Sequence, residues 1–180
     1  MTLPSTYPDV SCSLARALEV IGERWSLLIV RDAFYGVRRF SDFRAHLQAP
    51  RAVLADRLAA LVEAGVLERV PGTGAHDEYA LTAKGEQLWP SVRALVEWGD
   101  AHYAPDGPRR AFLHTACDAP VDGASVCTAC GERIAPADLT VAPGPGLPPG
   151  EEDADAVSAA LTQPHPMLAP LPTRRAKIRA

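Results

Sequence analysis

The chain has little that would place it in a membrane or outside the cell. Among its 180 residues, no apolar run approaches the ~18 residues that a membrane-spanning helix needs. The N-terminal MTLPSTYPDVSCS has no basic segment followed by an apolar one, so it lacks the pattern of a secretory signal. We therefore expect a cytoplasmic protein without a membrane partner, whose four cysteines are reduced.

A strong charge excess is also missing, because the formal net charge is −4 and charged residues make up 22% of the chain. A net charge of this size neither favours nor excludes nucleic acid as a partner, since a local patch decides. Such a patch is present between Arg38 and Arg57. This stretch contains five arginines and two aspartates, which gives a local net charge of +3, and it also contains His46.

Composition divides the chain into three segments. Residues 1–104 contain the periodic apolar pattern of a folded domain. Residues 105–141 begin at the helix-breaking PDGP and contain a cluster of cysteine and histidine. Residues 142–180 are rich in proline and alanine, and we expect them to be largely disordered, apart from a short helix after EEDAD. The closing RRAKIRA is basic and is either a solvated tail or a non-specific DNA contact.

Apolar spacing in the first segment predicts a mainly α fold with a small β-hairpin. Ser41 is the expected N-cap of the second helical region, and Gly65 is the expected stop of the third. The predicted helical regions are residues 12–36 (one or two helices), 40–47, 50–65 and 82–103, and the predicted strands are 66–70 and 78–81.

This order of elements is typical of a winged helix-turn-helix, whose second short helix enters the major groove of DNA. Arginines before the first short helix would contact phosphates, and the first turn of the second would reach base edges. Arg57 lies on the flank, as a phosphate contact or an internal ion pair. The predicted DNA contacts are Arg38, Arg39, Ser41, Arg51, Ala52, Ala55 and Arg57, with Arg69 and His76 in the hairpin.

His114, Cys117, Cys127 and Cys130 form two pairs with two residues inside each pair and nine between the pairs. This spacing is typical of a tetrahedral zinc site with one nitrogen and three sulfur ligands, in a small zinc-ribbon-like extension. A reversible disulfide between Cys127 and Cys130, or four free thiols, remain as alternatives. A zinc deaminase is excluded because HTA lacks the required glutamate. No nucleophile–base pair or open metal site is visible either, so we expect no enzyme.

Several stretches closely resemble HxlR-type winged-helix transcriptional regulators of the MarR-like superfamily. They are IGERWSLLIVRD, RRFSDFR, LADRLAALVEAGVL and YALTAKG, preceded by Cys12 at the start of the first helix, and the likeness covers residues 10–104. The resemblance implies a homodimer that binds short inverted repeats in double-stranded DNA through two-fold symmetry. It also implies dimerisation through the N- and C-terminal helices. Two sets of side chains agree with this: a stripe of Leu88, Val92, Leu95, Val96 and Tyr103, and the tryptophans Trp25, Trp89 and Trp98.

The resemblance also implies regulation, most simply a repressor that a small-molecule effector or a thiol reaction releases from DNA. Cys12 is the redox-sensing candidate, because a helix N-terminus favours the thiolate; a buried packing role is the alternative. Gln48 and Ala49 stand where the family often has Ile-Ser, which removes a capping hydroxyl and puts one phosphate contact in doubt. The alternative hypothesis is a protein-interaction module that has kept the winged-helix fold but no longer binds an operator.

Overall fold

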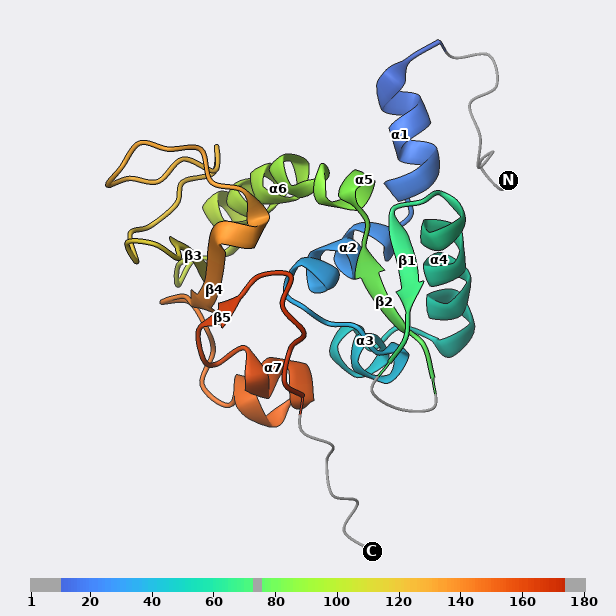
Figure 1. The fold of residues 1–180 in the computed structure, drawn as a ribbon. Coiled ribbons are helices and arrows are strands. Elements are labelled where there is room, and N and C mark those ends of the chain that lie inside the picture. Colours follow the sequence, from blue (N-terminus) through green and yellow to red (C-terminus); the bar gives the residue numbers. More distant parts are fainter. Residues whose placement is uncertain (1–10, 73–75, 174–180) are drawn as a thin grey trace, which may run out of the picture.

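The computed structural model describes residues 11–72 and 76–173 and contains two parts, a helical part and a smaller sheet-based extension (Figure 1). The tip of the predicted hairpin, within residues 73–75, and the basic RRAKIRA, residues 174–180, lie outside the described residues. The first part consists of α1 (Ser13–Ile21), α2 (Ser26–Phe34), α3 (Phe40–Leu47), α4 (Arg51–Glu63), β1 (Leu67–Val70), β2 (Glu78–Leu81), α5 (Ala83–Glu86) and α6 (Trp89–Tyr103).

The predicted order of helices and hairpin strands is confirmed, and this part is a winged helix-turn-helix. Gly65 ends α4 as expected. The Gly65 N–H donates to the Val62 carbonyl at 3.0 Å, and the Gly65 φ of +66° turns the chain so that the Val66 N–H reaches the Leu61 carbonyl at 2.9 Å. This turn leads directly into β1, whose register pairs Leu67 with Leu81 across the antiparallel hairpin.

Two local expectations are wrong. Ser41 does not cap α3, because the helix begins at Phe40 with Arg39 at the cap position, and the Ser41 hydroxyl instead donates to Asp42 at 3.1 Å. The predicted helix over residues 82–103 is two helices, α5 and α6. Pro90 lacks an N–H and is tolerated only in the first turn of a helix, so α6 starts anew at Trp89.

The core of the helical part lies between α2, α3, α4 and the hairpin. Phe34, Phe43, Leu54, Leu58 and Leu61 are fully buried in it. The three leucines recur along α4 at helical spacing, which is the pattern that the sequence predicts.

Aromatic side chains continue this core into the extension. Trp89 packs against Phe34 with ring centroids 5.0 Å apart and against Phe112 of the extension at 5.3 Å. Trp89 is 2% exposed, so its expected role in an aromatic surface is wrong. Trp89 belongs to the core because it lies on the face of α6 that packs between α2 and the extension.

The extension is a three-stranded antiparallel sheet in the order β3-β4-β5, with β3 (Arg110–His114), β4 (Leu139–Pro143) and β5 (His165–Pro166). Between β4 and β5 come the 3₁₀ turn η2 (Glu151–Asp153) and α7 (Ala156–Ala160); η1 (Pro136–Asp138) precedes β4. The expected short helix after EEDAD is therefore present.

The expectation of a largely disordered segment from residue 142 is corrected for residues 142–173. β4 crosses the predicted boundary at residue 141, and its partner β5 lies well beyond it. Proline-rich composition lowers the tendency to form helices and long strands, yet Val157, Leu161, Met167 and Leu171 are buried. These scattered apolar side chains have no period that sequence reasoning could detect.

Residues 167–173, which we call the C-terminal strap, run from the extension back to the helical part. The Leu168 N–H donates to the Phe34 carbonyl at 2.9 Å, and the Leu171 N–H donates to the Gly36 carbonyl at 2.8 Å. Gly36 has a φ of +85°, and a side chain there would overlap the carbonyl oxygen of Ala169. The strap therefore lies directly on the connection between α2 and α3.

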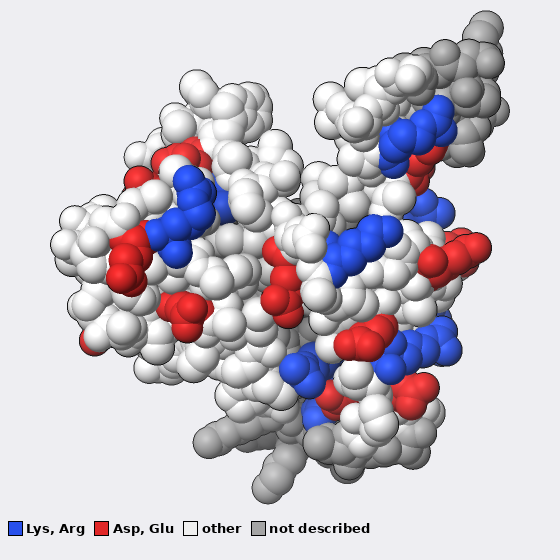
Figure 2. Space-filling model, turned by 45° about the horizontal axis from the view of Figure 1, so that its top comes forward, with Lys and Arg blue, Asp and Glu red and all other residues white. Residues whose placement is uncertain are grey.

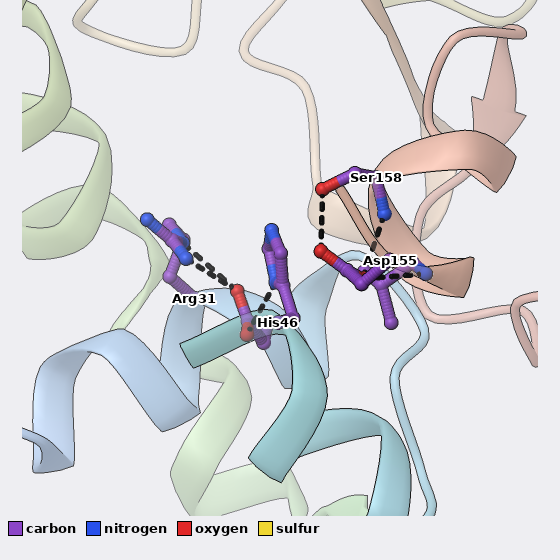
Figure 3. A network of polar contacts seen from close by, with 6 residues as sticks. Arg31, His46, Asp155 and Ser158 are labelled. Carbon is purple, nitrogen blue, oxygen red and sulfur yellow. Dashed lines mark hydrogen bonds and ion pairs between the residues drawn. The ribbon is translucent and has the colours of Figure 1, made fainter. Parts of the chain in front are cut away.

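Two polar networks lie near each other where α3 packs against α7 (Figure 3). In the first, Asp32 of α2 is fully buried and accepts from Arg31 at 2.7 and 3.0 Å, while its second oxygen lies 2.8 Å from His46 Nδ1 of α3. In the second, Asp155 caps α7 by accepting from the N–H groups of Val157 and Ser158. The first network joins α2 to α3, and the second caps the start of α7.

Burial raises the pKa of the Asp32 carboxyl, but the Arg31 charge and the His46 hydrogen bond outweigh it and hold that pKa below its ordinary value. Asp32 is therefore ionised at neutral pH and fixes α2 to α3. No helix among the described residues has the length and apolar composition to span a membrane.

Candidate nucleic-acid interface and metal centre

The outer face of α4 is exposed at the positions predicted to read DNA. Arg51, Ala52 and Ala55 are all exposed, while Leu54 and Leu58 on the opposite face are buried. The small alanine side chains leave the helix backbone open to close approach by a ligand. Arg51 is the first residue of α4, where the chain turns out of α3 through Pro50.

A groove of about 530 Å³ lies between α3 and the start of α4. Its lining brings together Ser41 and Arg51, two of the residues predicted to contact DNA, and the Arg51 guanidinium lies 5.8 Å from the Phe40 ring centroid. Arg44 and Gln48 line the same groove, and sequence reasoning did not select them. Arg44 could have been found from its place in the positive patch, on the same helix as Ser41.

Two of the predicted phosphate contacts already have internal partners. Arg38 is half-buried, and its Nη2 donates to the Leu168 carbonyl of the strap at 3.2 Å. Arg39 Nε lies 3.1 Å from Glu78 Oε1 of the hairpin. A neutral carbonyl leaves the positive charge of Arg38 uncompensated, whereas Glu78 offsets that of Arg39.

The remaining predicted contacts spread over the flank and the hairpin. Arg57 Nη1 is 4.0 Å from Glu23 Oε2, a weak contact that agrees with the internal ion pair considered for it. Arg69 on β1 and His76 before β2 are exposed. Basic side chains gather over the helical part and are interspersed with acidic ones (Figure 2).

Apolar side chains are exposed on the first and last helices of the helical part. Leu14 and Leu18 on α1, and Leu95, Trp98 and Tyr103 on α6, are between 40% and 74% exposed. The apolar residues predicted to form one stripe on α6 therefore lie on two faces. Val92 is buried in the core, while Leu95 and Tyr103 are exposed. Such exposed apolar surface is typical of a protein contact.

Cys12 occupies the N-cap position of α1 and is exposed, so a buried packing role does not apply to it. Trp25, just before α2, is half-buried.

The four predicted metal ligands converge at the end of β3. Their ligand atoms all lie within 4.8 Å of one another. His114 Nδ1 is 3.3 Å from Cys117 Sγ and 3.5 Å from Cys130 Sγ, and Cys117 Sγ is 3.6 Å from Cys127 Sγ. His114 and Cys127 are buried, while the other two are exposed. This donor set could hold a metal ion.

The two ligand pairs have the same backbone geometry. In the first, the Asp118 N–H returns to the His114 carbonyl at 2.8 Å; in the second, the Gly131 N–H returns to the Cys127 carbonyl at 2.9 Å. Asp118 and Gly131 both have positive φ, 53° and 72°. Each turn is closed by an isolated bridge, Leu113 to Pro120 and Val126 to Arg133. Two equivalent turns thus present four side chains to one point.

Hydrogen bonds from the backbone amides of Cys130 and Ala129, against the opposing effect of burial, lower the pKa of the Cys127 thiol to about 6. The thiolate is the form of cysteine that binds metals.

The loop between the two turns lies against α6. Gly123 comes so close to the Glu97 carboxylate that any side chain there would overlap it. Arg93 of α6 is buried, with its guanidinium 4.8 Å from the Phe112 ring centroid and a hydrogen bond of 3.4 Å to the Val121 carbonyl. The Cys/His cluster therefore packs on one face of α6, and the other face of α6 exposes Leu95 and Trp98.

A helix-turn-helix with an exposed second helix, a basic groove and a hairpin wing defines a winged-helix protein of the transcription-regulator class. Comparison with known proteins agrees. The HxlR-like helix-turn-helix family matches residues 20–106. The HTH-type transcriptional regulator Rv3095 of Mycobacterium tuberculosis is 44% identical over 138 residues, which cover 75% of this chain and 87% of the relative.

The HTH-type transcriptional regulator YtfH of Escherichia coli is 37% identical over 90 residues, covering 48% of this chain and 71% of that protein. Among solved structures, PA1607, a candidate transcription factor, superposes with a TM-score of 0.60 at 42% identity, over 71% of this chain and 91% of its own. The chain belongs to the HxlR-like helix-turn-helix family of transcriptional regulators. A match of 138 residues is longer than residues 1–104, so the likeness to Rv3095 continues into the extension.

Proposed function

We propose that this regulator is a cytoplasmic homodimer that binds a specific inverted-repeat operator in double-stranded DNA and acts as a repressor. The groove between α3 and α4, with Arg51 beside the exposed Ala52 and Ala55, is the observation that supports it most. Arg51 would contact a guanine or a phosphate, Arg44 and Ser41 would contact phosphates, and Arg69 and His76 would follow the neighbouring backbone.

The dimer would form through α1 and α6, since their exposed apolar side chains need a partner to leave water. Two-fold symmetry would then place two α4 helices on successive turns of one face of the duplex, ~34 Å apart. Repression would be steric, through occupation of a promoter, and no catalytic step is assigned to the chain.

Selection of bound sequences from random DNA tests this function. We expect an inverted repeat, and we expect Arg51→Ala to weaken binding to it by about 1–3 kcal/mol. Arg109→Ala, an exposed arginine of the extension, is the matched control and should leave the affinity unchanged. Failure to select any sequence, with a folded protein, would favour an interaction module without operator binding.

Dimerisation is tested by sedimentation of the variant Leu95→Asp/Trp98→Asp. These side chains are already exposed, so the monomer should remain folded. We expect the variant to be monomeric and to lose operator affinity, because a single α4 reads only one half-site. A variant that stays dimeric would place the interface elsewhere.

Release from DNA would follow from a small-molecule effector or from a thiol reaction at Cys12. Cys12 is exposed at the start of a proposed dimer helix, so a bulky adduct there would disturb the interface. We expect diamide or a quinone to release the wild-type protein and to leave Cys12→Ser bound. Equal release of both proteins would exclude sensing through this residue.

We also propose that His114, Cys117, Cys127 and Cys130 hold one structural zinc per chain. Ligands on a tetrahedral zinc are about 3.8 Å apart for two sulfurs and about 3.5 Å for sulfur and nitrogen, given the usual bond lengths. The separations of 3.6, 3.3 and 3.5 Å agree with these values. Four protein ligands leave no open position, which suits a structural role.

Elemental analysis of protein purified without chelators tests this site, with about one zinc per chain expected. Cys127→Ser should lose the metal, while Cys12→Ser, which keeps all four ligands, should retain it. Metal-free protein with four reactive thiols would support free cysteines, and loss of only two thiols would support the Cys127–Cys130 disulfide.

A further inference from the structure

Three arginines from different elements gather around one tyrosine where the helical part meets the extension. Arg31 lies on α2, Arg93 on α6 and Arg110 on β3. The charges of all three act on Tyr35, which directly follows α2 and is 3% exposed. The Arg31 guanidinium lies 5.9 Å from the Tyr35 ring centroid. Buried charges in proteins are normally paired with charges of opposite sign, so a group of cations at this depth needs an explanation.

Aromatic rings form the apolar surroundings of these cations. The ring centroid of Phe112 lies 6.3 Å from that of Tyr35 and 5.3 Å from that of Trp89. The Arg93 guanidinium lies over Phe112, 4.8 Å from its centroid. Phe112 and Trp89 are buried as deeply as Tyr35. The cluster therefore combines positive charge with aromatic surface.

Two of the three arginines are bound only by backbone carbonyls. Arg93 Nη2 donates to the Val121 carbonyl at 3.4 Å, and Arg110 Nη1 donates to the Leu161 carbonyl at 2.8 Å. Neither arginine has a carboxylate within 4 Å in the part of the chain that the structure describes. A carbonyl is neutral, so these contacts hold the guanidinium groups in place without compensating their charge.

Acidic residues offset the charge of the cluster only in part. Asp32 is paired directly with Arg31. Asp100 and Glu151 influence the other two arginines through charge alone, without a contact. The cluster thus keeps an excess of positive charge that an anion could neutralise.

Three hydrogen-bond donors of the cluster have no acceptor. Trp89 Nε1 and Arg93 Nε lie one turn apart on the same face of α6, and both are buried without a partner among residues 11–72 and 76–173. The Tyr35 hydroxyl has no hydrogen-bond partner in these ranges either. Burial raises the pKa of Tyr35, so its hydroxyl keeps the proton and can donate. Buried polar groups are rarely left unpaired. Since all three groups donate, the group that fits them is an acceptor.

We propose that this cluster binds a small aromatic carboxylate and is the effector site of the regulator. The carboxylate accepts from Arg93, Arg110 and the Tyr35 hydroxyl, because a guanidinium matches a carboxylate with two parallel hydrogen bonds. The ring of the ligand packs on the aromatic side chains, Phe112 among them. Arg31 and Arg110 are only half-buried, so the ligand enters from their side. The proposal rests on the proposed operator binding and names the class of effector.

Arg31 connects this site to the DNA-binding helices. It donates to Asp32, whose second oxygen is bound by His46 of α3 (Figure 3). An anion beside Arg31 competes with Asp32 for the guanidinium and weakens the attachment of α3 to α2. Arg93 lies on α6, the helix proposed to form the dimer. Ligand binding therefore acts on both parts of the proposed operator-binding machinery, and we expect it to lower the affinity for the operator.

Calorimetric titration of the full chain without DNA tests the site, with benzoate as the probe. Benzamide has the same ring without the charge, and acetate has the carboxylate without the ring. We expect benzoate to bind with a Kd of about 1 mM or below, and at least about tenfold more tightly than either control, since each control lacks one half of the recognition.

Two variants separate this site from general ionic binding. Arg110→Gln removes one charge and should weaken benzoate binding by about tenfold or more, because hydrogen bonds to charged groups are the stronger ones. Tyr35→Phe keeps the buried ring and removes only the hydroxyl, which should weaken binding by about three- to tenfold. Arg109→Ala, at the exposed neighbour of Arg110, is the matched control and should keep the wild-type Kd. Circular dichroism and thermal unfolding of each variant without ligand check that it is folded.

Operator affinity with and without benzoate tests the effector role. We expect saturating benzoate to weaken binding of the wild type to its selected duplex by about fivefold or more. The same concentration should leave the operator affinity of Arg110→Gln unchanged. Linkage requires the duplex to weaken benzoate binding by the same factor, which a second titration measures.

Each outcome bears on a separate part of the proposal. No binding of benzoate, equal binding of benzamide, or an unchanged Kd in both Arg110→Gln and Tyr35→Phe overturns the site and leaves operator binding intact. Equal binding of acetate overturns the aromatic class of the ligand. Benzoate that binds the wild type without changing its operator affinity overturns the effector role. A folded wild type that binds benzoate but no duplex overturns operator binding and leaves the ligand site standing.

Discussion

The helical part and the extension reach a fixed structure by different means. The helical part, residues 11–104, buries apolar side chains that recur at helical spacing, such as Leu54, Leu58 and Leu61 of α4. The extension has short strands, two matched turns around a Cys/His cluster, and a strap that ends on α3. The periodic apolar pattern accounts for the fold of the helical part, whereas the fold of the extension depends more on individual contacts between residues far apart in sequence.

This difference predicts unequal responses to substitution. The extension should depend most on its Cys/His cluster and on the buried Leu171 of the strap, whereas the loss of a single helix cap there should cost little. The helical part should tolerate the loss of a single surface contact and respond strongly only where a buried charge loses its partner. The predictions below test this contrast from the largest expected effect to the smallest.

Removal of the proposed zinc should have the largest effect, and it should be confined to the extension. Structural zinc contributes about 10–16 kcal/mol of apparent binding energy in small zinc domains, which is more than so small a sheet can supply by burial. After chelation, hydrogen exchange should accelerate in residues 111–142 and remain slow in α2 and α4. Addition of zinc should restore protection.

The zinc-saturated chelator is the control for that experiment, because it cannot remove zinc from the protein. Equal loss of protection in α4 would show that the two parts unfold as one unit, and the contrast between them would not hold. No change anywhere would show that the cluster is not a metal-dependent support.

How far the sequence predicts each region follows the same division. Helix and hairpin positions in the helical part are recovered because burial repeats with a period that the sequence displays. The break before Pro90 and the cap at Arg39 are missed, since both depend on local backbone geometry. The Cys/His ligands are found from spacing alone, because two short turns fix which side chains meet.

The strap and the sheet of the extension could not be predicted from the sequence for a physical reason. β4 pairs with β5 across more than twenty residues, and the buried side chains around that pairing, Leu139, Val141 and Met167, follow no pattern that links the two strands. Leu171 is buried against the helical part by a contact that no local pattern encodes. The positions of Arg38, held by Leu168, and of Arg44 in the groove follow from such tertiary contacts.

Asp32→Asn should destabilise the helical part by up to about 3–5 kcal/mol, because it removes a fully buried carboxylate and leaves the half-buried Arg31 and His46 without their anionic partner. Denaturant unfolding followed by tryptophan fluorescence measures this change. Glu19→Gln, which disrupts the more exposed contact with Arg16 on α1, is the control and should change stability by less than about 1 kcal/mol.

The same carboxylate predicts an acid dependence. The pKa of Asp32 is lower in the folded protein than its ordinary unfolded value of about 3.9, so its contribution to stability is complete above that value. The contribution is lost as pH falls through the folded pKa. Wild type should therefore lose stability more steeply than Asp32→Asn below about pH 4, and parallel curves would contradict this assignment.

Leu171→Ala should release the strap from the α2–α3 connection. Truncation of a buried leucine costs about 2–5 kcal/mol, and we expect the lower end because Leu171 lies at the edge of the core, 8% exposed. Proteolysis should then cut the chain near residue 168 at a protease concentration that leaves wild type intact. Leu168, which is less buried, is the matched site, and its alanine variant should be cut more slowly than Leu171→Ala.

Asp155→Ala should have the smallest effect, about 1 kcal/mol, because it removes an N-cap from a helix of only five residues. Asp155 accepts from the Val157 N–H at 2.8 Å, the Ser158 N–H at 3.1 Å and the Ser158 hydroxyl at 2.7 Å, so its loss frees three donors at the start of α7. Asp155→Asn keeps an oxygen acceptor and should retain most of the stability. The network of Asp155 lies near that of His46 (Figure 3), but Asp155 is half-buried, whereas Asp32, the partner of His46, is fully buried. An Asp155→Ala loss as large as that of Asp32→Asn would contradict this ranking and would mean that the cap of α7 also supports the packing of α7 against α3.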